Sequence, residues 1–189
     1  MDNLINIEAD IEWLAQIIKE RVKDRAFDFD AVKPINFEQK CVYSNFINSN
    51  CKNNEERLLV ILVLVPHIYP VFLHRKFTST YLHTSTRGAH STKCPEHYSA
   101  IVKSSTSESY LPTGQTFLYL VGGDNIRKRV KNIRCIYEGV FFTITNNIIS
   151  PIKNSTYDPL LGNIITLNQN YALAFLTNNE KLINNEKRS

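Results

Sequence analysis

The hydrophobic pattern is dominated by one stretch in which aliphatic residues follow one another without interruption. Residues 58–65 are consecutive leucines, valines and an isoleucine. A segment that is apolar on all sides has to be covered on all sides, so the run predicts a central buried element with others packed around it. We interpret it as a core helix. Because half of these side chains are β-branched, a buried strand remains the alternative.

Polar residues and prolines mark the ends of this element. The two glutamates that precede the run favour the positive end of a helix dipole, with Asn53 or Asn54 as the N-cap. Pro66 lacks an amide hydrogen and disfavours a helical conformation at Val65, so we expect the helix to break or kink there. A second short helix is expected to follow over residues 68–77.

The N-terminal region has the spacing of an amphipathic helix over residues 2–26. Apolar residues recur every three or four positions, and charged residues fill the opposite face. The simplest partner for the apolar stripe is the run at residues 58–65, although a stripe of this kind also suits a helix that binds another protein. The stripe consists of Ile7, Ile11, Leu14, Ile18 and Val22.

Shorter helices are predicted on both sides of the central run. Residues 27–39 lack periodicity and are expected to form a connecting loop before a helix over residues 41–48. Thr113 suits the N-cap of a helix that contains the apolar residues 117–121. A helix over residues 125–136 is expected to be capped by Asp124, with an apolar face made of Ile126, Val130, Ile133 and Ile136 or Tyr137.

The C-terminal part of the chain shows strand patterns. Residues 140–145 predict a strand that continues at residues 148–149 after a turn, and residues 162–167 predict its antiparallel mate. A last helix is expected from Asn168 or Gln169 to residue 176. The predicted fold class is therefore α+β, mainly helical, with a small C-terminal antiparallel β-hairpin.

Length and composition set the domain organisation. With 189 residues and 43% hydrophobic content, the chain can bury one sizeable core. We expect a single domain over residues 1–178 and a flexible polar tail over residues 179–189, with two small lobes as the alternative. No signal-peptide pattern and no run of 18 or more apolar residues occurs, so we expect a cytoplasmic location without a membrane span. The four cysteines lack C-x-x-C spacing and are expected to be free thiols.

Residues 78–110 differ from the rest because serine, threonine, histidine and glycine dominate and large aliphatic residues are few. They predict a long irregular loop, and loops of this length in compact domains often carry function. Together with residues 111–116, this loop is the best candidate surface for binding another protein. The candidate partner-binding residues are Tyr81, Arg87, His90, Tyr98, Tyr110, Leu111, Thr113 and Gln115.

The same loop contains the residue types of a zinc site or a thiol enzyme. His83, His90, Cys94 and His97 could ligate zinc, but only the last two have the close spacing of structural sites. A polar surface loop is the simpler interpretation. Cys94 with a nearby histidine could also act as a nucleophile, although closeness in sequence is weak evidence for that. We therefore predict no bound metal, no cofactor and no catalysis.

ATP and nucleic acid are two further classes of ligand on which the sequence bears. No glycine cluster is followed by the lysine of a Walker loop, so the chain is not expected to bind ATP. The net charge of +4 is mild for a nucleic-acid binder. A basic helix followed by a hairpin would nevertheless resemble a winged helix, which keeps a nucleic-acid-binding regulator as the alternative function. Its basic residues are Arg127, Lys128, Arg129, Lys131 and Arg134.

Several stretches, taken in order, resemble the N-terminal region of a group of bacterial AAA-type ATPases, some of which are encoded beside contractile injection systems. The stretches are Ile11-Glu12-Trp13-Leu14 with Arg21, Glu56-Arg57-Leu58-Leu59, Val65-Pro66-His67-Ile68-Tyr69-Pro70, Leu111-Pro112-Thr113-Gly114-Gln115-Thr116, Leu160-Leu161-Gly162-Asn163-Ile164-Ile165 and Asn170-Tyr171. The resemblance covers residues 4–178. One departure is that residues 99–110 lack the glycine-rich loop usual in the family.

The resemblance implies a non-catalytic adaptor domain. The Walker loops of the ATPase module do not occur in these 189 residues, so nucleotide chemistry would lie elsewhere. Such a domain would recognise a protein client or attach to a component of a larger assembly.

Overall fold

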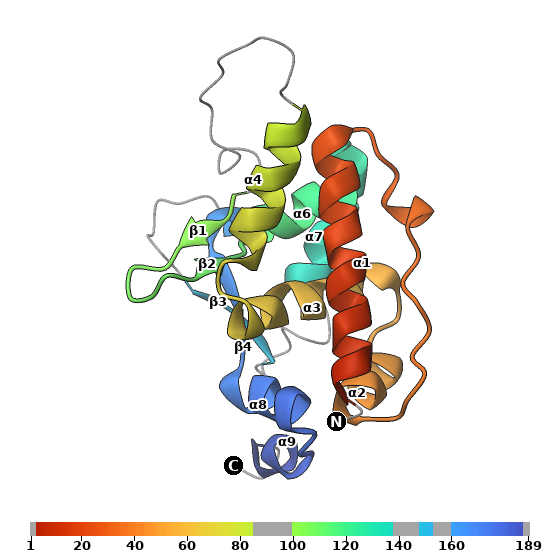
Figure 1. Cartoon of the computed structure of the whole chain (residues 1–189), viewed down its shortest axis with the longest axis vertical. Coiled ribbons are helices and arrows are strands. Elements are labelled where there is room, and N and C mark those ends of the chain that lie inside the picture. Colours follow the sequence, from red (N-terminus) through yellow and green to blue (C-terminus); the bar gives the residue numbers. More distant parts are fainter. Residues whose placement is uncertain (1–2, 85–99, 138–147, 153–159, 187–189) are drawn as a thin grey trace.

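The computed structural model describes residues 3–84, 100–137, 148–152 and 160–186. This part of the chain is mainly helical with two small antiparallel strand pairs, which confirms the predicted α+β class (Figure 1). The helices are α1 (Asn3–Lys23), α2 (Val42–Asn50), α3 (Asn54–Ile68), α4 (Phe72–Thr84), α6 (Gly114–Gly122), α7 (Ile126–Tyr137), α8 (Gln169–Thr177) and α9 (Lys181–Glu186). The strands are β1 (Val102–Lys103), β2 (Tyr110–Leu111), β3 (Ile149–Ile152) and β4 (Ile164–Leu167), and Phe29–Ala31 and Leu160–Gly162 form 3-10 turns.

Helix α3 occupies the centre of the fold. Every residue from Glu56 to Pro66 is buried, and α1, α4, α6, α7 and β4 pack around the helix. Its first turn is capped by Asn53, whose side-chain oxygen accepts from the backbone N–H of Glu56 at 2.9 Å. The prediction of a core helix is confirmed, and the alternative of a buried strand is wrong.

The break after this helix lies further along the chain than predicted. Helix α3 continues through Pro66 to Ile68, and its axis then turns by 108° into α4. The last turn closes because Tyr69 donates its N–H to the carbonyl of Val65 at 2.8 Å. Tyr69 itself lies outside the helical region, with φ −128° and ψ 85°, because a residue that precedes a proline disfavours helical angles. Pro70, rather than Pro66, therefore ends the helix.

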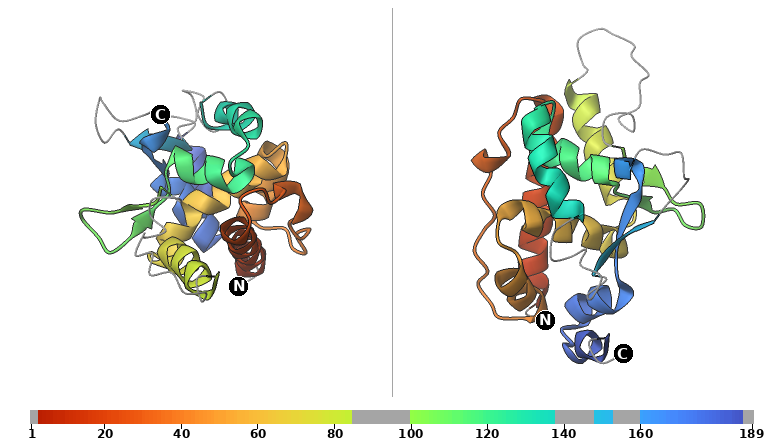
Figure 2. Two further views of the ribbon diagram at one scale, coloured as in Figure 1. Left: turned by 90° about the horizontal axis from the view of Figure 1, so that it is seen from above. Right: turned by 180° about the vertical axis from the view of Figure 1, so that it is seen from behind.

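Helix α1 has the predicted amphipathic character. Ile7, Leu14 and Ile18 are at most 1% exposed. The stripe packs against α3 as expected and also lies along α4, with which α1 runs side by side in two views (Figures 1 and 2). The apolar stripe of α1 is therefore covered by other helices of the same chain.

Two predicted boundaries are corrected. Residues 78–84 belong to α4, and residues 102–103 pair with residues 110–111, so the predicted irregular loop 78–110 is shorter than expected. Residues 85–99 lie outside the described residues. The predicted tail contains α9, whose Ile183 is only 7% exposed and packs on the core.

The C-terminal strand pair is present in a shifted form. Strands β3 and β4 are antiparallel, with Ile149 opposite Leu167 and Ile152 opposite Ile164. The strand predicted at residues 162–167 is present from Ile164 onward, because residues 160–162 form a 3-10 turn, and it pairs with residues 149–152. The predicted strand at residues 140–145 lies outside the described residues.

Helix α7 departs from its predicted cap and face. The side chain of Asn125, not Asp124, accepts from the N–H of Lys128 at 3.1 Å. Ile126 and Val130 are 74% and 59% exposed, although Ile136 is buried. Seen from above, α7 and α4 lie on opposite sides of the molecule (Figure 2).

In the described ranges, no single helix has the length and apolar character to cross a membrane. Helix α3 and residues 72–79, taken together as a pair bent by 108°, would be long and apolar enough by length and composition alone.

Candidate functional site

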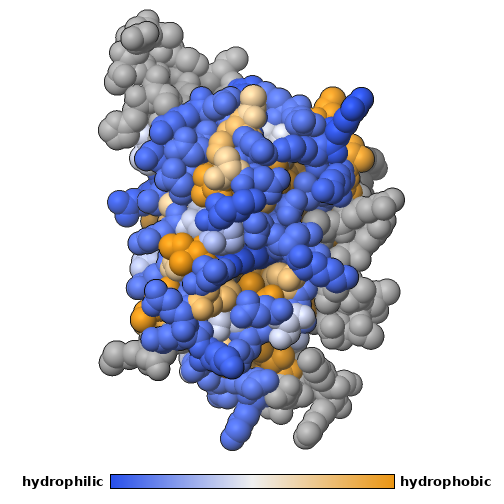
Figure 3. Space-filling view, turned by 90° about the vertical axis from the view of Figure 1, so that its right-hand side faces the viewer, coloured by the Kyte–Doolittle hydropathy of each residue, from blue (hydrophilic) through white to orange (hydrophobic). Residues whose placement is uncertain are grey.

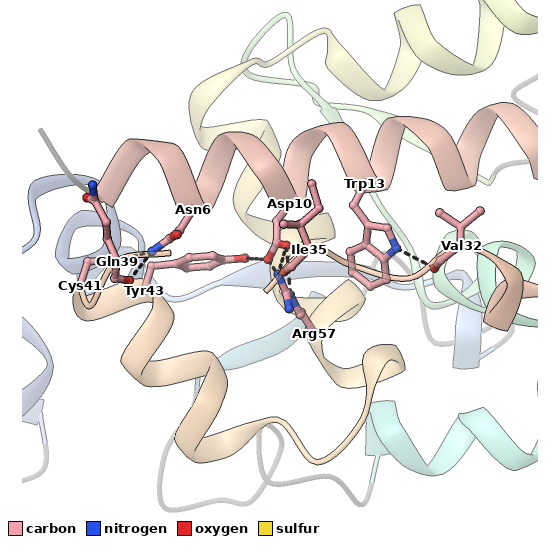
Figure 4. A network of polar contacts seen from close by, with 9 residues as sticks. All are labelled: Asn6, Asp10, Trp13, Val32, Ile35, Gln39, Cys41, Tyr43 and Arg57. Atoms are coloured by element: carbon pink, nitrogen blue, oxygen red, sulfur yellow. Dashed lines mark hydrogen bonds and ion pairs between the residues drawn. The ribbon is translucent and has the colours of Figure 1, made fainter. Parts of the chain in front are cut away.

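A buried network of polar side chains joins α1, α2 and α3 (Figure 4). Arg57 donates from Nε to Asp10 Oδ1 at 3.0 Å and from Nη2 to the same oxygen at 2.6 Å. Tyr43 donates its hydroxyl to Asp10 Oδ2 at 2.6 Å. Asp10 is fully buried, and this desolvation raises its pKa against the lowering effect of the hydrogen bonds from Arg57 and Tyr43.

The same network fixes the segment between α1 and α2. Arg57 Nη2 donates to the carbonyl of Ile35 at 2.8 Å, and Trp13 Nε1 donates to the carbonyl of Val32 at 2.9 Å. Asn6 donates to the carbonyl of Gln39 at 2.7 Å. These contacts are internal, which gives the network a structural role. Over this segment, the described surface is mostly hydrophilic with small separate hydrophobic areas (Figure 3).

A second buried arginine joins the C-terminal ends of α1 and α6. Arg21 is 1% exposed and donates to the carbonyls of Leu120, at 3.2 and 3.1 Å, and of Arg25, at 2.7 Å. Desolvation lowers the pKa of this guanidinium. Gly123 lies against it with φ +52°, where a Cβ atom would come within 2.0 Å of the Arg25 carbonyl oxygen. This contact is structural as well.

The surface with the character of a binding site lies at the bend between α3 and α4. A groove of about 430 Å³ is lined by Tyr69, Pro70, Val71, Phe72, Arg75, Lys76 and Ser79, and we call it the elbow groove. Tyr69 and Val71 remain 53% and 40% exposed, although both are large apolar side chains. Among the described lining residues, the charged ones, Arg75 and Lys76, are both basic. The groove therefore combines an apolar wall with positive charge.

Strand β2 supports the elbow groove and brings two of the predicted site residues beside it. Tyr110 donates its N–H to the carbonyl of Pro70 at 2.8 Å. Its ring stacks on His74 of α4, with centroids 4.3 Å apart and planes 16° apart. Leu111 is the next residue of the same strand and is partly buried. The predicted surface near residues 110–111 thus adjoins the elbow groove.

The other predicted partner-binding residues have different positions. Thr113 is 1% exposed and caps α6 together with Thr116, so its role is structural. Gln115 accepts a short hydrogen bond from Arg129 on α7. The side chain of Tyr81 and the whole of Arg87, His90 and Tyr98 lie outside the described residues.

The candidate zinc and thiol residues also fall outside the described part. This applies to the side chain of His83 and to His90, Cys94 and His97. Within the described ranges, no three His, Cys, Asp or Glu residues converge as metal ligands would. Cys51 is a free cysteine, and burial raises the pKa of its thiol, so thiolate chemistry is disfavoured there.

Two basic side chains of helix α7 form ion pairs or hydrogen bonds within the chain. Lys128 forms an ion pair with Asp28 at 2.6 Å. Arg129 donates to the carbonyl of Gly123 at 2.9 Å and to Gln115. Arg127 and Lys131 are exposed, and the side chain of Arg134 is not described. Two of the five basic residues are therefore engaged in holding α7 to its neighbours.

Comparisons with known proteins identify no family for this chain. No family model, no curated protein and no solved structure matches it. The chemistry of the surface is therefore the basis for a functional proposal.

Sequence reasoning missed the elbow groove because its residues adjoin the apolar run. Residues 68–77 were predicted only as a second short helix, and that prediction does not indicate that Tyr69 and Val71 are exposed. The signal available was Pro70, which ends α3 just before the bend.

Proposed function

We propose that this chain is a non-catalytic protein-recognition domain that binds its partner through the elbow groove. The observation that carries the proposal is the exposure of Tyr69 and Val71 beside Arg75 in a groove of about 430 Å³. Exposed apolar side chains that gather in a hollow, rather than singly, are typical of interaction sites.

The rigidity of the surrounding elements supports this assignment. Helix α3 is buried on all sides, α4 packs along α1, and β2 is hydrogen-bonded to Pro70. A preformed surface binds with a smaller ordering cost than a mobile one. The groove is therefore suited to recognising a segment of another protein.

The resemblance to the N-terminal region of bacterial AAA-type ATPases agrees with this function. In that setting the domain would select a protein client or assembly component for an ATPase module. The nucleic-acid-binding alternative has less support, because Lys128 and Arg129 contact groups of the chain itself.

Affinity capture with matched variants tests the proposal. Wild-type protein, the groove variant Tyr69→Ser/Val71→Ser and the control variant Ile126→Ser/Val130→Ser would be used to capture proteins from the native host. The control changes two exposed apolar residues on α7, on the opposite side of the molecule. Captured proteins would then be purified and titrated against all three variants.

We expect the groove variant to weaken the affinity for a captured protein at least tenfold, because interface anchors typically contribute more than about 1 kcal/mol each. The control should bind like the wild type. Equal recovery and equal affinity with the groove variant would contradict the proposal.

A further inference from the structure

We propose that the occupant of the elbow groove is an extended acidic segment of the partner protein, in which an apolar residue and a carboxylate lie two positions apart. This inference rests on the proposed function and specifies the partner of the same groove. It follows from the charge of the groove and from the spacing of its residues along α4.

Arg75 and Lys76 are both exposed, and none of the described lining residues is acidic. Lys76 lies over the ring of Phe72, 5.6 Å from its centroid, which leaves Arg75 as the cation to consider. In the described ranges, no ion pair and no hydrogen bond engages the Arg75 guanidinium. By contrast, several other exposed basic residues form ion pairs with carboxylates of the chain, as Lys103 does with Glu108 at 3.0 Å. Positive charge beside an apolar wall favours a ligand that carries both an apolar group and a carboxylate.

The distance between the apolar and basic residues of the groove sets the distance between the apolar group and the carboxylate of the ligand. Val71 directly precedes α4, and its carbonyl accepts from the N–H of Arg75 at 3.0 Å, so the two residues are one helical turn apart. Phe72 and Lys76 are four residues apart within α4. Four helical residues rise by about 6 Å. Two residues of an extended chain span about 6.6 Å, and side chains at positions i and i+2 point to the same side. An extended segment therefore places both groups on the groove.

The openness of the groove favours a peptide over a small molecule. Small ligands are usually buried by 70% or more in their pockets. Here the apolar wall is formed by Tyr69 and Val71, which are themselves about half exposed. An extended segment can lie along such a shallow surface, and its neighbouring residues add contacts beyond the groove. A nucleic acid would supply the negative charge but would leave the aliphatic part of the wall without an apolar partner.

Selection from a displayed library of random twelve-residue peptides on the full chain tests the inference. Peptides would be selected on the wild type and rescreened against Tyr69→Ser/Val71→Ser and Arg75→Glu/Lys76→Glu. The matched control is Arg127→Glu/Lys131→Glu, which reverses two exposed charges on α7. Circular dichroism would establish that each variant is folded.

The expected result is a set of peptides with an aspartate or glutamate two positions from an apolar residue. Their binding should be lost with both groove variants and retained with the control. Groove-dependent peptides without acidic residues would overturn the inference and leave the proposed function standing. If no selected peptide depends on the groove, both the inference and the proposed function are overturned.

Affinities of single synthetic peptides give the second measurement. We expect replacement of the peptide's carboxylate by the matching amide to weaken binding by up to about fivefold, because exposed ion pairs contribute at most about 1 kcal/mol. Arg75→Glu/Lys76→Glu in the protein should weaken it at least as much, since it reverses the charges. The effect should shrink as salt rises, because exposed charges are screened. Unchanged affinity for the amide peptide would overturn the inference.

Discussion

At the scale of single residues, two buried arginines hold the helices in place through different acceptors. Arg57 pairs with the carboxylate of Asp10, whereas Arg21 donates to backbone carbonyls. Their partners are 47 and 99 positions away in sequence. No periodicity or motif links residues so far apart, so the sequence predicted neither contact.

Replacing Arg57 alone should be strongly destabilising. Arg57→Met would leave the carboxylate of Asp10 buried without its cation, and breaking a buried pair in this way costs about 3–5 kcal/mol. Urea unfolding monitored by circular dichroism measures the change. Lys131→Met is the matched control, because Lys131 is exposed and its replacement should change the free energy of unfolding by less than about 0.5 kcal/mol. Equal stability of the two variants would contradict the structural role of the pair.

The raised pKa of Asp10 predicts the direction of a pH effect. An acid whose folded-state pKa lies above its ordinary value of 3.8 binds its proton more tightly in the folded state. The contribution of Asp10 to the free energy of unfolding therefore falls as the pH rises from 3.8 through its folded-state pKa. Above the folded-state pKa, this contribution is constant.

Asp10→Asn provides the comparison, since an amide does not ionise. The free energy of unfolding of the wild type minus that of Asp10→Asn should decrease across this pH range. Urea unfolding of both proteins between pH 4 and pH 7 measures the difference. An increase of this difference with pH would contradict the prediction, because it would mean that the ion pair with Arg57 lowers the pKa of Asp10 more than burial raises it.

At the scale of elements, local chemistry predicted where helices begin better than where they end. Asn53 and Thr113 act as N-caps as expected, because a cap bonds to residues of its own first turn. The end of α3 was predicted at Pro66, but the helix continues to Ile68, because Pro70 and not Pro66 ends it. The pair β1–β2 was missed, since strands of two residues have no detectable alternation.

The cap of α3 is testable with adjacent asparagines. Asn53→Ala should lower the free energy of unfolding by about 1 kcal/mol, because the N–H of Glu56 loses its acceptor. Asn54→Ala should have a smaller effect, since Asn54 is the first helical residue and not the cap. Thermal and urea unfolding of the two variants compare the effects directly. A larger loss from Asn54→Ala would place the cap at the other position.

The junction of α1 with α6 depends on Gly123. Its φ of +52° disfavours other residues, and an added Cβ atom would clash with the Arg25 carbonyl. Gly123→Ala should therefore destabilise the fold by about 2 kcal/mol or more. Ser107→Ala in the exposed β1–β2 turn is a control that should remain near the wild type. An unchanged unfolding midpoint for Gly123→Ala would contradict this close approach.

At the scale of the whole molecule, the elbow groove lies on a rigid support. The buried polar network and the central helix fix the framework, and the elbow groove lies where that helix turns by 108° into α4. Sequence reasoning predicted a binding surface near Tyr110 and Leu111, which adjoin the groove. It did not identify Tyr69, Val71 and Arg75, because exposure at a bend depends on the angle between two helices.

The most direct test of recognition through the elbow groove is site-specific photo-crosslinking in the native host. The photoreactive residue p-benzoylphenylalanine would replace Tyr69 in one variant and Ile126 in another, both of which are exposed. The account predicts covalent adducts with a partner protein from position 69 that are absent or much weaker from position 126. The same adducts at equal yield from both positions, or adducts from position 126 alone, would contradict it.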